Sequence, residues 1–424
     1  MSAPLTPTAA RRVFLLLTVT RWFPIGLVVG VMTLLPLERG LSVAATLTAL
    51  ALTGWVVFAL ELPTSSVADA LGRRPVYLVA SLVQVAAAAV YLVADSFWGF
   101  ALAAGLMGVF RALDSGPLEA WFVDTVHATT PGADVDGHLS AQSTVLGVSI
   151  SAGALVSGGL VWWHPVASSS ALALPFAVYL ALAAAHVAAV LVWLKEPARS
   201  GTGGAGGALA SAREAPAVVR DGLRLLGRSP VLRGLVVVEV FWSVAMVVFE
   251  TFQPIRLAEL LGSGERAGAW MGAVAAAGWG VFSAGSALAG RASRRIGVTR
   301  TAVLARVLNG LGAVTMGLVA GPVALVAAYL VTYGLHGAGG PVHSALLHRE
   351  AHSGNRATVL SMNSMMAFAA FSLATPLLGL LAERTSTPVA MVTAGALSVL
   401  GALWYLPARR QERRRLAETA AVPV

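Results

Sequence analysis

The sequence has no cysteine and very few charges. The absence of cysteine excludes disulfides, thiolate metal sites and thiol nucleophiles. Only 12% of the 424 residues are charged and 57% are hydrophobic, whereas soluble domains carry about 25% charged residues. No Gly-x-x-x-x-Gly-Lys-Ser/Thr phosphate loop occurs, so any uphill transport would need an ion gradient or a partner subunit. These absences exclude an ordinary soluble protein and favour one that crosses a membrane many times.

Apolar segments long enough to cross a bilayer, about 20 residues each, recur along the chain. We predict an all-α polytopic membrane protein with twelve membrane-spanning helices in two six-helix bundles. The expected spans are 13–36, 43–64, 75–94, 97–124, 138–162, 171–194, 231–257, 267–290, 298–320, 322–347, 355–382 and 387–407. The corresponding domains are an N-terminal bundle at 1–194, a linker at 195–229, a C-terminal bundle at 230–408 and a basic tail at 409–424.

The linker is rich in glycine and then becomes amphipathic. Residues 201–206 match a Gly-x-Gly-x-x-Gly dinucleotide fingerprint, but that fingerprint needs a strand before it and a helix after it. A charged segment precedes it here, so a flexible linker is the better interpretation. Leucines and arginines then alternate through 218–228, which predicts an amphipathic helix on the inner membrane face.

The positive charge is distributed as a topology signal. With both termini in the cytoplasm, 22 of the Lys and Arg residues fall on the cytoplasmic side and 4 on the outside. This bias accounts for the net charge of +9 without nucleic-acid binding. We therefore expect a multi-pass protein of the inner or plasma membrane, with the lipid bilayer as its surroundings.

Two pairs of segments repeat between the halves. Residues 65–74 resemble residues 286–295 at an offset of 221, and Gly116-Pro117-Leu118-Glu119 resembles Gly340-Pro341-Val342-His343 at an offset of 224. Parallel repeats of six helices imply two similar bundles with a binding site between them near the midplane of the bilayer.

The layout and these motifs resemble the major facilitator superfamily, in particular its bacterial drug/proton antiporter branch. In that family the loop after helix 2 carries Gly-x-Leu-Ala-Asp-Arg-x-Gly-Arg-Arg. The resemblance implies a conformational latch at the matching residues and at the basic residues of the second copy. These are Asp69, Gly72, Arg73, Arg74, Arg291, Arg294 and Arg295. The alternative is a turn whose arginines serve topology alone.

The family's antiporters also carry a Gly-Pro-rich motif in helix 5. Residues 153–159 keep the paired glycines Gly158 and Gly159 but lack the proline. Close helix packing is still expected there, while the direction of transport is left open.

Ionisable residues inside membrane spans are costly and usually mark functional sites. On the fourth span, Arg111 and Asp114 are three residues apart on one helical face, and Glu119 lies further along. A cation beside a buried acid can balance its charged and neutral forms. We therefore expect proton coupling at Arg111, Asp114, Glu119 and Glu250; the alternative is a fixed Arg111–Asp114 pair that only joins helices.

In the family, helices 1, 4, 7 and 10 line the central cavity, and most buried ionisable residues here fall on those helices. The candidate cavity or substrate residues are Arg21, Trp22, Glu239, His336 and His343. Arg21 needs an acidic partner or an anionic substrate, and a partner is favoured. Glu239 and Glu250 are eleven residues apart and are expected to face one way at different depths. The histidines have packing as their alternative role, and His186 and Arg306 are assigned to packing or interhelical hydrogen bonds.

These features together predict a proton-coupled secondary transporter, monomeric, that exports small amphipathic molecules by alternating access. One alternative is an importer of an organic anion or sugar, held by Arg21 and Arg111. Another is a membrane enzyme or sensor, although no catalytic triad or intramembrane metal cluster supports it. No cofactor and no metal are expected, because a proton gradient would supply the energy.

Overall fold

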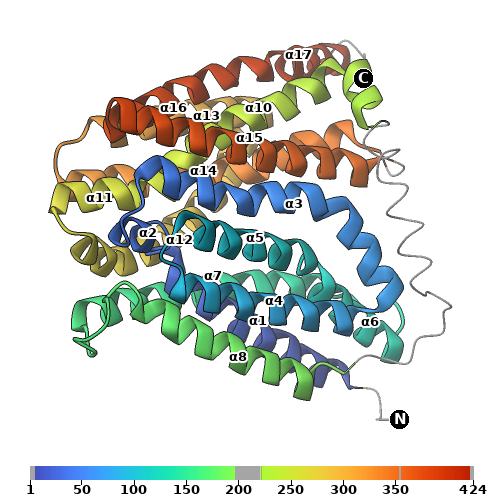
Figure 1. The fold of residues 1–424 in the computed structure, drawn as a ribbon. Helices are drawn as coiled ribbons and strands as arrows, with labels where there is room; N and C mark the ends of the chain where they lie inside the picture. The colour runs from blue at the N-terminus through green and yellow to red at the C-terminus, as the bar shows by residue number, and fades with distance from the viewer. Residues whose placement is uncertain (1–4, 196–219, 221, 353–354, 421–424) are drawn as a thin grey trace. The chain divides into compact units, whose positions relative to one another are not determined.

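The computed structural model describes residues 5–195, 220, 222–352 and 355–420, with the backbone alone described at 61–70, 357 and 415–420. Every regular element in this part of the chain is helical (Figure 1). The N-terminal half contains α1 (Pro7–Val29), α2 (Leu34–Glu38), α3 (Val43–Leu71), α4 (Arg73–Val93), α5 (Phe97–Leu113), α6 (Pro117–Thr129), α7 (Asp136–Trp163) and α8 (Leu174–Trp193).

The C-terminal half begins with a helix that changes its type. α10 (Pro230–Val247) continues through a π-helical turn, Val248–Phe252, into α11 (Gln253–Leu261). The remaining elements are α12 (Gly264–Ile296), α13 (Val298–Leu318), α14 (Pro322–Glu350), α15 (Arg356–Arg384), α16 (Thr387–Gly401), a short 3-10 segment (Ala402–Tyr405) and α17 (Leu406–Ala420).

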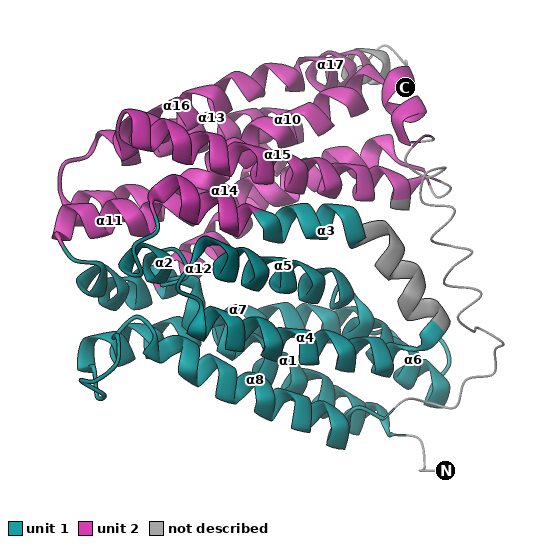
Figure 2. Cartoon of the chain, in the orientation of Figure 1, with its two compact units in different colours: residues 1–41, 52–215, 263–276 teal, residues 42–51, 216–262, 277–424 magenta. Residues whose placement is uncertain are grey.

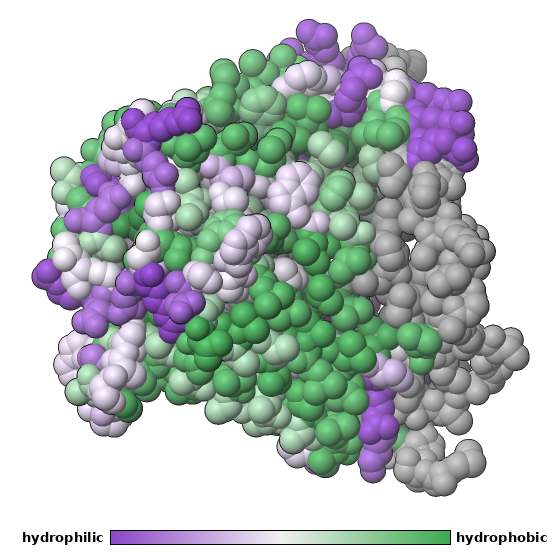
Figure 3. Space-filling model, viewed as in Figure 1, coloured by the Kyte–Doolittle hydropathy of each residue, from purple (hydrophilic) through white to green (hydrophobic). Residues whose placement is uncertain are grey.

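The prediction of twelve spans is confirmed. In the described residues, twelve helical segments are long and apolar enough to cross a membrane, and each overlaps one expected span, with ends that differ by up to seven residues. On the face shown in Figure 3, hydrophobic residues predominate and hydrophilic residues gather near helix ends. The chain is a multi-pass membrane protein.

Polar caps and prolines set where many spans begin. The side chains of Thr6, Ser96, Ser229 and Ser386 each accept a hydrogen bond from a backbone N–H in the first turn of the helix that follows. Such N-caps satisfy donors that have no partner within the helix. Proline stands in the first turn of several of these helices, where its missing N–H costs nothing.

The helices form two compact units, coloured in Figure 2. Unit 1 comprises residues 1–41, 52–215 and 263–276, and unit 2 comprises 42–51, 216–262 and 277–424. Residues 42–51 of the N-terminal half thus group with unit 2, and residues 263–276 of the C-terminal half group with unit 1.

In unit 1, aromatic packing and close helix contact hold the core. Phe14 of α1 stacks on Phe122 of α6 with ring centroids 4.5 Å apart. Gly158 of α7 approaches Gly272 of α12 so closely that a Cβ on Gly158 would lie 2.8 Å from the Cα of Gly272. Gly159 has nothing within 4 Å of a Cβ. Gly158 therefore provides the close packing expected of the paired glycines in the fifth span, α7, and Gly159 makes no such contact.

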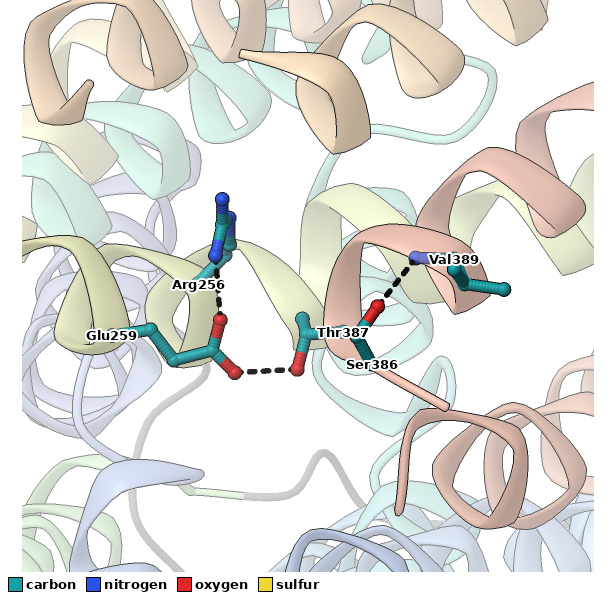
Figure 4. Close-up of polar contacts among 5 residues, drawn as sticks. All are labelled: Arg256, Glu259, Ser386, Thr387 and Val389. Atoms are coloured by element: carbon teal, nitrogen blue, oxygen red, sulfur yellow. Dashed lines mark hydrogen bonds and ion pairs between the residues drawn. The ribbon is translucent and has the colours of Figure 1, made fainter. Parts of the chain in front are cut away.

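In unit 2, a polar contact joins the end of α11 to the start of α16 (Figure 4). Glu259 accepts a hydrogen bond of 2.5 Å from the Thr387 hydroxyl and pairs with Arg256 at 2.9 Å. Ser386, the neighbour of Thr387, caps α16 through the backbone N–H of Val389. The contact links two spans that are distant in the sequence.

Most of the predicted linker lies outside the described residues, namely 196–219 and 221. Residues 222–228 are helical, and Leu225 and Leu226 pack against the core of unit 2. This part of the predicted amphipathic helix therefore turns two of its leucines towards protein, although lipid was expected there.

Candidate functional site

A buried ion pair joins the first and fourth spans of unit 1. Arg21 of α1 contacts Asp114, the residue that ends α5. The Asp114 residue is 3% exposed, and the Arg21 guanidinium lies 4.3 Å from the centroid of the Trp22 ring and 5.6 Å from that of Phe110. Removing either charge would leave the other without this partner in a setting of low polarity. Arg21 thus has the acidic partner that its depth in the span predicts.

The fourth span is not one continuous helix, as the sequence had suggested. α5 ends at Leu113, and α6 begins at Pro117 after Gly116, whose φ of 93° is left-handed. Glycine adopts this conformation without the steric cost that other residues meet, and Pro117 at the first helical position favours a new start. The predicted geometry across 97–124 is therefore wrong: the helical registers of α5 and α6 are independent.

The break separates the predicted proton-coupling residues into different environments. Arg111, on the last turn of α5, is exposed, whereas Asp114 is buried against Arg21. Glu119, in the first turn of α6, is half-buried and accepts a hydrogen bond of 3.1 Å from Gln142 of α7. Its carboxylate also acts electrostatically on Arg21. The cation at the centre of this cluster is therefore Arg21.

Unit 2 holds a second buried cluster, centred on Glu239 of α10. One Glu239 carboxylate oxygen lies 3.6 Å from Nη2 of Arg306 on α13 and 3.5 Å from Nε2 of His343 on α14. Glu239 is 5% exposed and Arg306 is 3% exposed. The Arg306 guanidinium carbon lies 3.9 Å from the centroid of the Trp242 ring. A carboxylate, a guanidinium and an imidazole thus meet away from water.

The imidazole of His343 is bonded on both nitrogens. Nδ1 lies 2.9 Å from the Tyr405 hydroxyl, and Nε2 lies 3.2 Å from Oδ1 of Asn363 on α15. Asn363 also hydrogen-bonds the Glu239 carboxyl. Because Nε2 faces two oxygen acceptors, the proton of the neutral ring belongs there, and Nδ1 accepts from Tyr405. A chain of side chains therefore connects Glu239 to Tyr405.

His336, two helical turns before His343 on α14, is surrounded by aromatic rings. The ring centroids of Trp242, Phe249, Phe282 and Tyr333 lie 4.8, 4.9, 5.4 and 5.5 Å from that of His336. Its Nδ1 is buried with no hydrogen-bond partner in the described chain. This arrangement gives unit 2 an aromatic cluster next to the Glu239 cluster, since Trp242 belongs to both.

Glu250 does not share the environment of Glu239. It lies in the π-helical turn Val248–Phe252, whose wider hydrogen bonding changes the angular position of the residues that follow. Glu250 is exposed and interacts with Tyr329 and Tyr333, whereas Glu239 is buried. The two carboxylates, which were expected to face one way at different depths, therefore lie in different environments.

The latch residues of the first half lie at the turn between α3 and α4. Gly72 has a φ of 104°, a conformation that glycine adopts without steric cost. Arg73 pairs with Asp124 of α6 at 3.5 Å, and Arg74 donates to the carbonyl of Leu191 on α8 at 3.1 Å. The backbone of Asp69 is helical, and its side chain lies outside the described atoms.

The second copy of this loop is displaced from its predicted register. The glycine that opens α13 is Gly297, with a φ of 89°, which corresponds to Gly72 at an offset of 225. The offset of 221 is wrong by four residues, one helical turn. Arg291, Arg294 and Arg295 are exposed on the last turns of α12, before that glycine.

Sequence reasoning missed several members of these clusters. Arg306 was assigned to packing or interhelical hydrogen bonds and not to the site, and Gln142, Asn363 and Tyr405 were not singled out. The structure uses Arg306 for an interhelical ion pair, and His186, also assigned to packing or hydrogen bonding, bonds Thr20 at 2.8 Å. A basic residue in the middle of an apolar span was the available signal for Arg306.

Comparison with known proteins identifies the fold. A family-wide sequence model described as Major Facilitator Superfamily matches residues 14–347 and, in an overlapping stretch, 282–424. Among curated proteins, no sequence match reaches significance.

Solved structures of transporters have a similar fold. The nucleoside transporter NupG superposes with a TM-score of 0.75 at 12% identity, covering 94% of this chain and 98% of that one. A peptide transporter POT in complex with sulfate gives 0.72 at 14% identity, covering 94% of each chain. A POT family transporter in complex with 5-aminolevulinic acid gives 0.68 at 13% identity, with 93% and 95% covered. At these identities the likeness concerns the fold.

Proposed function

The chain belongs to the Major Facilitator Superfamily, and we propose that this secondary transporter exchanges protons for small amphipathic molecules and exports them. The family membership makes the protein a transporter rather than an enzyme. What we propose beyond family membership is the coupling to protons, the kind of cargo and the direction of transport.

The observation that carries the proposal is the position of Glu239. Its carboxylate is buried between a guanidinium and an imidazole, and a chain of hydrogen bonds leads from it to Tyr405. Protonation of Glu239 would cancel its attraction for Arg306 and change the bonding of Asn363. A proton taken up there would therefore alter how α10, α13, α14 and α15 hold together.

The Arg21–Asp114 pair is the corresponding element of unit 1. Protonation of Asp114 would free the Arg21 guanidinium, with Glu119 close enough to act on the released charge. Arg111, Glu119 and Glu250 remain in the proposal as exposed or half-buried groups that adjust these equilibria or meet the cargo.

The aromatic rings around His336 support an amphipathic cargo. Trp242 and Phe282 are partly exposed and offer stacking and cation–π surfaces, whereas Phe249 and Tyr333 are buried. The Glu250 carboxyl interacts with Tyr333. An apolar, planar cation would find both a ring surface and a carboxylate in this unit. The proposal therefore favours amphipathic cations over organic anions.

Purified protein in proteoliposomes tests the coupling. With a pH-sensitive dye inside the vesicles and ethidium as the probe cargo, ethidium movement should drive an opposite movement of protons. Glu239→Gln should abolish this proton movement and keep ethidium–ethidium exchange, which needs no net proton transfer. Asp95→Asn, which removes an exposed loop carboxylate, is the matched control and should behave as the wild type.

Two outcomes would contradict the proposal. Normal proton-coupled movement in Glu239→Gln would remove the proton role of that residue. Proton movement in the same direction as the cargo, in wild-type vesicles, would favour the importer instead.

A further inference from the structure

A groove of about 420 Å³ lies between α1 and α8 of unit 1. Val19 and Phe23 belong to its α1 wall, and Ala185, Val192 and Trp193 belong to its α8 wall. Its volume falls within the range of about 300–1,000 Å³ found for small-molecule sites. The alanines of α8 create the space, because larger side chains at these positions would fill it.

The floor of the groove is apolar and its polar groups are satisfied. Thr20 and His186, which also line it, are hydrogen-bonded to each other at 2.8 Å. His186 is 1% exposed, whereas Val19, Val192 and Trp193 are 40%, 60% and 41% exposed. The groove therefore offers an incoming molecule shape and apolar contact, and it is open along one side.

Two exposed cations, Arg12 and Lys195, lie beyond one end of the groove. Arg12 precedes Val19 by seven residues, two helical turns, so it lies on the same face of α1, and both are exposed. On α8, the exposed Lys195 follows Trp193 by two residues. The two cations are at the same end, because Ala10 near the start of α1 and Leu194 at the end of α8 pack in one hydrophobic cluster.

We propose that this groove binds one acyl chain of an anionic phospholipid, whose phosphate is held by Arg12 and Lys195. α1 and α8 are both membrane-spanning helices, so lipid is the molecule that reaches an open apolar groove between them. Tryptophan at the mouth of the groove suits the boundary between acyl chains and headgroups. The neighbouring cations attract anionic headgroups in preference to zwitterionic ones.

The bound acyl chain would fill the space between α1 and α8. Lipid tails are as apolar as the groove, so the preference for this site comes from fit and from the two cations. A chain in the groove covers the Thr20–His186 bond and packs the exposed faces of Val19 and Val192. The lipid would thus stay with the protein when the surrounding bilayer is removed.

Native mass spectrometry of the full-length protein tests the site. Protein released from nanodiscs that contain equal amounts of phosphatidylglycerol and phosphatidylcholine should retain one phosphatidylglycerol molecule after detergent washing. Ala185→Phe fills the groove and should lower the retained fraction at least tenfold. Ala184→Phe is the matched control, because Ala184 is equally exposed but does not line the groove, and it should retain the lipid.

A second pair of changes separates headgroup from chain. Arg12→Gln with Lys195→Gln should leave a lipid in the groove and remove the preference for phosphatidylglycerol. Ala188→Phe, another groove-lining change, replaces Ala185→Phe if that variant fails to fold, as judged by gel filtration.

The proposal is overturned if Ala185→Phe and Ala184→Phe lose lipid equally, which would mean annular lipid only. It is also overturned if the wild type retains no lipid. The same holds if the molecule that binds the wild type and is lost in Ala185→Phe has the mass of a second copy of the polypeptide or of a non-lipid compound.

Discussion

Gly72 and Gly297 have nearly the same backbone conformation, with φ and ψ of 104° and 156° in the first and 89° and 155° in the second. Each is the residue from which a span begins, α4 and α13 respectively. This region of φ and ψ is accessible essentially to glycine alone. The two halves of the chain therefore repeat a turn that depends on the absence of a side chain.

Replacing either glycine with alanine should destabilise the protein. Gly72→Ala and Gly297→Ala are each expected to cost about 1–3 kcal/mol, because alanine is strained at this φ. Thermal unfolding of the purified variants in detergent measures the loss. Gly321→Ala is the control, since Gly321 also precedes a span but has a φ of −128° and open space around a Cβ. Equal unfolding temperatures for all three variants would contradict the expectation.

The Arg21–Asp114 pair allows structure and transport to be separated. Asp114→Asn should lower stability by about 3–5 kcal/mol, because it leaves the buried Arg21 charge without its partner. The double variant Arg21→Met with Asp114→Leu should recover most of that loss, since an apolar pair can replace a buried ion pair at little cost. Unfolding of the single and the double variant in detergent measures the loss of stability and its recovery.

The same double variant decides between the two roles of the pair. If it is stable and yet moves no protons with cargo in proteoliposomes, the pair serves coupling. A stable double variant with normal coupled transport would show that the pair only joins helices.

The hydroxyl of Tyr405 should contribute measurably to the Glu239 cluster. Tyr405→Phe removes the bond to His343 Nδ1 and is expected to cost about 0.5–1.5 kcal/mol. Tyr91→Phe is the matched control, because the Tyr91 hydroxyl is buried without a hydrogen-bond partner among the described residues. Chemical unfolding measures the loss of unfolding free energy in each variant. A larger loss in Tyr91→Phe than in Tyr405→Phe would contradict the hydrogen bonding described for His343.

The two neighbouring glycines of α7 should differ in their tolerance of a side chain. Gly158→Ala places a methyl group against Gly272 and is expected to cost about 1–3 kcal/mol through overpacking. Gly159→Ala meets open space and should be neutral, or stabilising by about 0.5–1 kcal/mol through helix propensity. Thermal unfolding distinguishes them; an equal response would mean that α7 moves away from α12 without cost.

The number and type of elements could be predicted because the bilayer imposes the length of each apolar segment. The pairing of charges could not. Arg21 and Asp114 come from different helices, and their contact depends on how each helix is rotated about its axis. Apolar spans carry little amphipathic pattern from which to derive that rotation, so the interhelical role of Arg306 was foreseen only in general terms.

Two local errors have physical causes. The break at Gly116 was missed because a proline in an apolar run is compatible with a kinked helix as well as with a new start. The repeat register slipped from Gly297 by four residues because positions four apart lie on the same helical face and carry similar residues. The positive φ of Gly297, which settles the register, is not written in the sequence.

The interruption at Asp114–Gly116 also has a mechanical consequence. The backbone N–H of Asp114 closes the last bond of α5 onto Phe110, and the N–H of Ala120 opens α6 onto Gly116. The hydrogen-bond ladders of α5 and α6 therefore lie on either side of Ser115. A change in the angle between α5 and α6 would therefore move Glu119, which belongs to α6, relative to the Arg21–Asp114 pair at the end of α5.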